Sequence, residues 1–101
     1  MAAHEKFLAM ILANARREEA SRVVLQVDND KAEIHLLLLD GSSRPLSAPP
    51  PEILLKIIES LEKGDTDFRS SVFAATVETV SVQRGPSGIL ASISEWIIEH
   101  N

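Results

Sequence analysis

The side chains best suited to chemistry in this chain are three histidines, and their spacing argues against a shared site. His4, His35 and His100 stand near the two ends and within the first half of the sequence, with no helical or strand spacing that would pair them. A zinc site needs three or four ligands that converge on one point. The chain also has no cysteine. We therefore expect neither a metal site nor a cofactor.

Serines and carboxylates are abundant, but none stands in a pattern that marks an activated group. No serine lies in a G-x-S-x-G elbow, and no G-x-x-x-x-G-K-[ST] phosphate loop is present. Asp28-Asn29-Asp30 begins like a calcium loop, yet Glu33 and Leu39 occupy the positions that require glycine and glutamate. This segment predicts a turn, and we expect a protein that is not an enzyme.

One glycine-containing segment leaves an alternative open. Gly85-Pro86-Ser87-Gly88 precedes a stripe of apolar residues that fits a helix. Free N–H groups at a helix N-terminus bind anions. A small-molecule or nucleotide sensor that uses this loop is therefore the second hypothesis for function, beside a plain turn.

Two amphipathic helices are predicted from apolar residues that recur on one stripe. The first covers about residues 3–19, and the second follows the proline run Pro49–Pro51 and ends near Gly64. The apolar spacing over residues 89–97 favours a third, C-terminal helix, although residues 88–93 also fit the second arm of a hairpin.

The strands are predicted from β-branched and apolar runs bounded by turn residues. Pro45 suggests an edge position for the shortest run. The predicted segments are Val23–Val27, Ala32–Leu39, Arg44–Ser47 and Ser71–Gln83. With no linker or repeat, residues 1–101 form a single domain of the α/β (α+β) class. We expect an antiparallel sheet of roughly three to five strands with the helices packed on one face.

The most informative feature is a run of consecutive leucines in the second predicted strand. Side chains of a strand alternate between its two faces, so such a run makes both faces apolar. Helices that cover one face leave the other as an apolar patch, which usually marks an interface. The alternative is a helix that wraps the second face. The candidate interface residues are Val24, Leu36, Leu37, Leu38 and Leu39.

Charge and hydropathy restrict the partners. The net charge of −5 argues against nucleic acid, which requires a concentrated basic surface. No run approaches the ~20 apolar residues of a membrane span. The apolar stretch Phe7–Ala13 is short and follows Glu5, so we expect an ordinary helix rather than a signal peptide. The expected partner is another protein or a second copy, in the cytoplasm, with no membrane insertion.

The order of elements resembles the domain that precedes the motor domain in type II secretion and type IV pilus assembly ATPases. That family carries A-S-D-I-H-x-E, then V-R-x-R-x-D-G, then a proline-rich lead into a helix. The corresponding stretches here are Ala20–Gln26, His35–Gly41 and Ser47–Glu52. The resemblance covers about residues 5–64, and its motifs are only partly kept.

The resemblance implies a stand-alone relative that has lost both the motor domain and the nucleotide contacts. The family's arginines, which can reach nucleotide phosphates, fall on Leu36 and Leu38, which predicts that these two leucines are exposed. Strand alternation from Glu33 and His35 instead predicts exposure of Leu37 and Leu39. We favour the register of the family.

The first hypothesis for function is thus a non-catalytic, self-associating protein-interaction domain, with a possible link to secretion or pilus machinery. Further alternatives are an acidic secretion-chaperone-like domain and a roadblock-like dimeric scaffold of the kind that regulates GTPases.

Overall fold

The computed structural model describes residues 2–101 as an α+β fold with two helices and a six-stranded antiparallel sheet. Along the chain, a helix and three strands are followed by a second helix and three further strands. The elements are α1 (Ala3–Arg17), β1 (Ala20–Asp28), β2 (Lys31–Leu38), β3 (Ser43–Leu46), α2 (Pro51–Glu62), β4 (Asp67–Arg69), β5 (Phe73–Arg84) and β6 (Gly88–His100).

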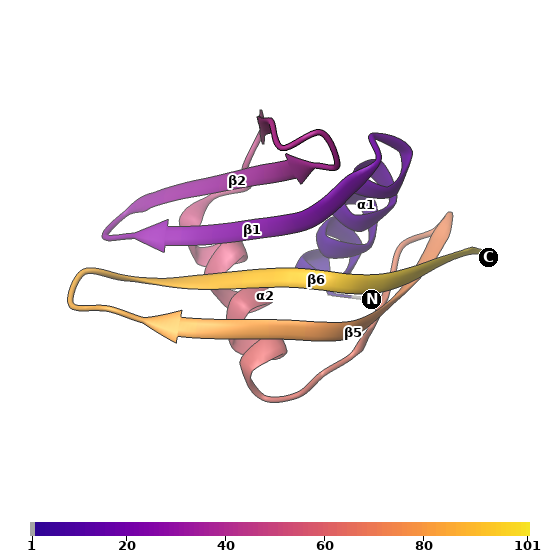
Figure 1. The fold of residues 1–101 in the computed structure, drawn as a ribbon. Coiled ribbons are helices and arrows are strands. Elements are labelled where there is room, and N and C mark those ends of the chain that lie inside the picture. Colours follow the sequence, from indigo (N-terminus) through magenta and orange to yellow (C-terminus); the bar gives the residue numbers. More distant parts are fainter. Residues whose placement is uncertain (1) are drawn as a thin grey trace.

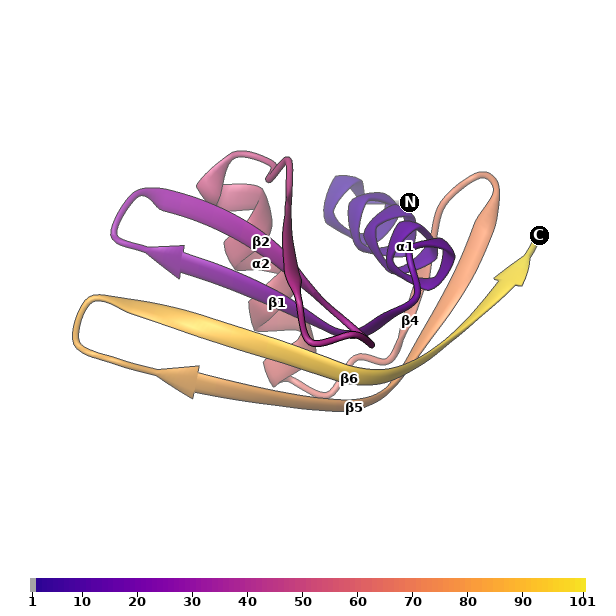
Figure 2. The ribbon, with the colours of Figure 1, turned by 45° about the horizontal axis from the view of Figure 1, so that its top comes forward.

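The sheet has the order β3-β2-β1-β6-β5-β4, so its two central strands come from opposite ends of the chain. Both helices lie on the same side of this sheet, with α2 behind β1, β6 and β5, and α1 beside it (Figures 1 and 2). The other side carries no helix, which is a common arrangement for antiparallel sheets. Helices on one face were predicted, and the structure confirms them.

Both helices form where the apolar stripes predicted them. The stripe of α1 buries Leu8, Ile11, Leu12 and Ala15 against the sheet. α2 begins at Pro51, whose missing N–H costs nothing in a first helical turn. The chain turns just after α2 at Gly64, whose φ of +99° suits glycine.

The core lies between the helices and the inner side of the sheet. Alternate side chains of the strands point toward the helices and are buried, as strand geometry requires. In β1 these are Val23, Leu25 and Val27. Leu54, Ile57 and Ile58 meet them from α2. The core is therefore aliphatic, with Phe68 and Trp96 as its buried large aromatic residues among those described.

The predicted C-terminal helix over residues 89–97 is wrong, because this segment forms most of the central strand β6. Pairing of β6 with β5 shifts register on both strands: Ser94 is extra on β6, and Glu78 is extra on β5. Such bulges bend a strand and change which side chains face inward. The buried apolar side chains that face the helices are therefore Ile89, Ala91, Ile93 and Trp96. The three-residue step at the bulge imitates helical spacing.

The prediction of three to five strands is also wrong, because the sheet has six. The two missed strands are β6 and the short β4, which buries Phe68 at the far edge of the sheet. The edge position of β3, suggested by Pro45, is confirmed: β3 is the outermost strand beside β2.

Candidate functional site

The side of the sheet that faces away from the helices, called the open face here, is not covered by either helix (Figure 1). Strand pairing places its side chains in rows. In one row His35, Val24, Ser92 and Ser81 are neighbours across β2, β1, β6 and β5. In the next row the neighbours are Glu33, Gln26, Leu90 and Gln83.

Three apolar side chains on the open face form a diagonal that we call the open-face strip: Leu37, Val24 and Leu90. Leu37 pairs with Arg22, two residues before Val24, and Leu90 pairs with Gln26, two residues after it. Diagonal neighbours of this kind lie within reach of long side chains. All three are half-buried among polar neighbours. The strip therefore crosses the three strands in the middle of the open face.

The favoured register of the leucine run is wrong. Leu36 is 0% exposed and belongs to the core, and Leu38 packs partly against that core. Their side chains point toward the helices because Ile34, two residues earlier, also does. Leu36 therefore contributes no accessible surface, so it drops out of the candidate interface, whereas Leu37 and Val24 lie on the open face.

Leu39 follows β2 and is 73% exposed, the highest value among the large apolar side chains described. It stands at a turn that Asp40 closes: the carboxylate accepts hydrogen bonds from the Ser42 hydroxyl (2.6 Å) and the Ser42 N–H (2.9 Å). These hydrogen bonds hold the pKa of the Asp40 carboxyl below its usual value. Leu39 is thus presented by a firmly closed turn.

A second concave surface, the α1 groove, is formed by α1 together with residues at the ends of β3, β5 and β6. It encloses about 720 Å³ and is lined mainly by apolar side chains, with Arg16, Arg17 and His100 at its rim. Its apolar lining includes Phe7, Met10, Ile11, Leu46, Phe73 and Ile98. Met10 is 48% exposed.

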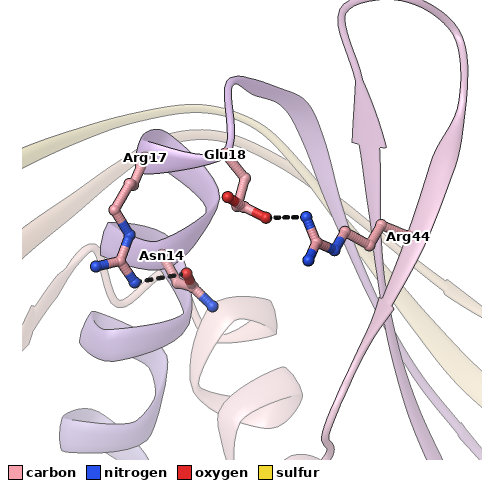
Figure 3. A network of polar contacts seen from close by, with 4 residues as sticks. All are labelled: Asn14, Arg17, Glu18 and Arg44. Carbon is pink, nitrogen blue, oxygen red and sulfur yellow. Dashed lines mark hydrogen bonds and ion pairs between the residues drawn. The ribbon is translucent and has the colours of Figure 1, made fainter.

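Polar contacts at the C-terminal end of α1 tie this helix to β3 (Figure 3). The Arg44 guanidinium of β3 forms an ion pair with Glu18. Arg17, the last residue of α1, donates a hydrogen bond at 2.9 Å to the side-chain oxygen of Asn14, which lies one turn before it. These side chains are mostly at the surface, where such pairs contribute little to stability. The Arg44–Glu18 pair joins β3 to the end of α1, whereas the Arg17–Asn14 hydrogen bond lies within α1.

Gly85–Gly88 forms the hairpin turn between β5 and β6, where the Gly85 N–H donates to the Gly88 oxygen at 2.9 Å. The anion site predicted here depended on a helix after Gly88. Because β6 occupies that position, no helix N-terminus faces the loop. The turn instead meets the β1–β2 turn, since the Asn29 N–H donates to the Ser87 oxygen at 2.9 Å.

The three histidines lie on different elements. His4 is on α1, His35 is on the open face 3.6 Å from the Glu33 carboxylate, and His100 lies against the Phe73 ring. No group of three or more metal-binding side chains occurs within residues 2–101. In the same range, every buried side-chain nitrogen or oxygen has a hydrogen-bond partner.

Sequence reasoning missed Leu90 as a surface residue because it assigned this position to a helix. The signal that identifies Leu90 as a surface residue is the alternation of side chains along this strand. Leu90 and Ser92 lie on one face, and Ile89, Ala91 and Ile93 lie on the other.

No protein-family model matches the chain, and comparison with curated proteins finds no relative. Within the described part of the chain, no helix is both long and apolar enough to cross a bilayer.

Proposed function

We propose that this protein is a non-catalytic protein-interaction domain that binds its partner through the open face of the sheet. The observation that carries the proposal is the open-face strip, in which Leu37, Val24 and Leu90 lie side by side across the central strands. Polar residues surround the strip, and interfaces typically have this pattern of an apolar centre and a polar rim.

Two surface carboxylates take part in contacts that hold the fold together. Here the carboxylates with lowered pKa values are Asp40 and Glu62, which lie at the surface and are held by Ser42 and Arg84. These contacts close a turn and attach a helix to a strand.

The link to secretion or pilus machinery stays a prediction that rests on the partial motifs in residues 20–52. The secretion-chaperone-like and roadblock-like alternatives are likewise predictions about a protein of the same broad architecture. All of them agree with a surface that binds protein.

Site-specific photo-crosslinking in the native cell tests the open face. A benzophenone side chain at Leu37 is expected to give one dominant protein adduct, and the same group at Lys56 on the exposed side of α2 is expected to give none. The further substitution Val24→Lys, which charges the centre of the strip, should abolish the Leu37 adduct. Equal labelling from both positions, or an adduct that survives Val24→Lys, would contradict the proposal.

A further inference from the structure

The α1 groove lies on the helix side of the sheet and shares no residue with the open-face strip. Most of its lining belongs to α1, where Met10, Ala13 and Arg17 follow at intervals of three and four residues and therefore lie on one stripe. The rest comes from the ends of β3, β5 and β6, which flank this helix in Figure 2. The groove is thus assembled from four elements that are far apart in the sequence.

The apolar side chains of the groove are only partly covered by the rest of the fold. Met10 is 48% exposed, and several others are half-buried. The half-buried ones include Phe7, Leu46, Phe73 and Ile98. Small-molecule sites combine a concave apolar lining of this kind with a few polar groups that orient the ligand. The groove therefore offers apolar surface that a ligand can remove from water.

The volume of the groove favours a small ligand with a slender apolar part. It encloses about 720 Å³, within the roughly 300–1,000 Å³ of small-molecule sites. One turn of a peptide helix occupies roughly 400 Å³, from its diameter and its pitch, so a helix of several turns would extend well beyond the groove. A flat bilayer surface cannot contact the lining of a concave groove. A single alkyl chain, by contrast, can lie within it.

The charged groups of the groove are cationic, although the net charge of the chain is −5. Arg16, Arg17 and His100 belong to the lining, and no aspartate or glutamate among residues 2–101 does. The neighbouring carboxylate at the end of α1, Glu18, already pairs with Arg44. An anionic group therefore meets complementary charge in the groove, whereas the acidic excess on the rest of the surface repels it.

Arg17 has donors for the head group of such a ligand. Its Nη2 atom donates to the Asn14 oxygen at 2.9 Å, and its other nitrogens make no hydrogen bond within residues 2–101. Arg16 is less available, because its guanidinium lies over the Trp96 ring and donates to the Trp96 carbonyl. A guanidinium can bind both oxygens of one carboxylate at once. The donors of Arg17 therefore suit a ligand with a single carboxylate.

We infer that the α1 groove binds one molecule of a free fatty acid, a single alkyl chain that ends in a carboxylate. The chain lies against the half-buried apolar side chains, and the carboxylate binds Arg17. Burial of the chain supplies the affinity, and the cationic lining selects the charge of the head group. The inference concerns a different surface from the open face and does not depend on the function proposed for that face.

Isothermal titration calorimetry with dodecanoate, kept below its micelle concentration, tests the inference. We expect saturable binding of one dodecanoate per chain. Octanoate and decanoate should bind more weakly, by about two- to fourfold for each methylene removed, because each methylene contributes buried apolar surface. Dodecyltrimethylammonium has the same chain and the opposite charge, and it should bind at least about tenfold more weakly than dodecanoate.

Two variants assign the binding to the groove. Ala13→Trp fills the groove without a change in charge, and Arg17→Glu reverses the charge beside the head group. Each should weaken dodecanoate at least about tenfold. Arg17→Glu should also tighten dodecyltrimethylammonium, a gain that loss of folding cannot imitate. Lys31→Glu is the control for charge, because Lys31 is exposed and does not line the groove, and it should bind dodecanoate like the wild type.

Three results would overturn the inference: no saturable binding of dodecanoate, equal affinity for the two ligands of opposite charge, or full affinity in an Ala13→Trp variant whose circular dichroism matches the wild type. Sedimentation with phosphatidylglycerol vesicles separates a free fatty acid from a membrane surface. The chain is expected to stay in the supernatant. Binding to these vesicles without binding of dodecanoate would assign the groove to a lipid surface and would also contradict the inference.

Discussion

At the scale of single residues, Trp96 connects the helix layer to the sheet. Its indole N–H donates a buried hydrogen bond to the Leu12 oxygen of α1 at 3.1 Å. The Arg16 guanidinium lies 4.7 Å from the centre of the indole ring, a cation–π distance, and also donates to the Trp96 carbonyl. One side chain of β6 thus holds the C-terminal half of α1 by apolar, polar and electrostatic contacts.

Replacement of this residue by phenylalanine should measure the polar part of that attachment. Trp96→Phe removes the indole N–H and leaves a small void, and we expect the free energy of unfolding to fall by about 1–3 kcal/mol. Urea denaturation followed by circular dichroism gives this value, since the chain has no other tryptophan for fluorescence. Arg16→Gln, which removes the cation–π contact and the guanidinium hydrogen bond to the Trp96 carbonyl, is expected to cost less, because Arg16 is exposed. The reverse order would show that the contacts of Arg16 are the main attachment.

At the scale of elements, the predictability of a segment follows from the continuity of its pattern. The leucine run and the valine run before it show strand character directly, and the two helices show uninterrupted apolar stripes. The sequence of β6 shows no continuous strand pattern, because the bulge at Ser94 changes which side chains face inward between Ile93 and Trp96. The position of a bulge depends on how a strand pairs with its neighbour. In β5, the partner of β6, the extra residue Glu78 can be recognised only once the pairing of the two strands is known.

The residues of the candidate site could also be predicted only in part from local patterns in the sequence. Strand alternation within β2 correctly placed Leu37 on the outside, but the resemblance to a family favoured Leu36, and only the position of the helices decided between them. The place of Leu90 on the open face depends on which strands become neighbours. Those contacts join residues far apart in the chain, so no local pattern encodes them.

The hairpin between β5 and β6 contains a position where β1 comes unusually close. A Cβ atom added to Gly88 would lie 2.4 Å from the Val27 oxygen and 2.9 Å from the Asp28 Cα. These are backbone atoms of the neighbouring central strand and cannot move separately. Gly88 is therefore required for β6 to pair with β1 at this end of the sheet.

Gly88→Ala is expected to lower the free energy of unfolding by about 1–3 kcal/mol or more, because it overpacks a backbone contact. Gly85→Ala is the matched control in the same turn. Its added Cβ would meet nothing closer than 4.0 Å, so its effect should stay within about 0.5 kcal/mol. Urea titration followed by Trp96 fluorescence compares the two. Equal losses would mean that the turn, and not the approach of β1, requires glycine.

At the scale of the whole molecule, the fold is two layers with helices on one side only (Figure 2). Adjacent residues of one strand therefore have different surroundings. Leu36 is 0% exposed beneath the helices, and the side chain of Leu37 is half-buried on the open face. The two leucines are chemically identical and one position apart, so a comparison of their variants tests the layer arrangement directly.

Leu36→Ala should cost about 2–5 kcal/mol of unfolding free energy, because it leaves a cavity in the core. Leu37→Ala removes the same atoms from a partly solvated site and is expected to cost less than about 1 kcal/mol. Thermal and urea denaturation at low protein concentration measure both values on the monomer. Similar costs at the two positions would argue for a second layer that covers the open face.

The central position of β6 also affects how the chain acquires its structure during synthesis. β1 lies at the middle of the sheet and is made early, yet its second neighbour is β6, whose residues 88–93 leave the ribosome last among the strands. Until then the nascent chain has two separate halves, one of three strands and one of two, and the inner border of each is unprotected. Such borders are sites of mispairing. The interval before residue 88 emerges is thus the time when these two borders are most open to mispairing.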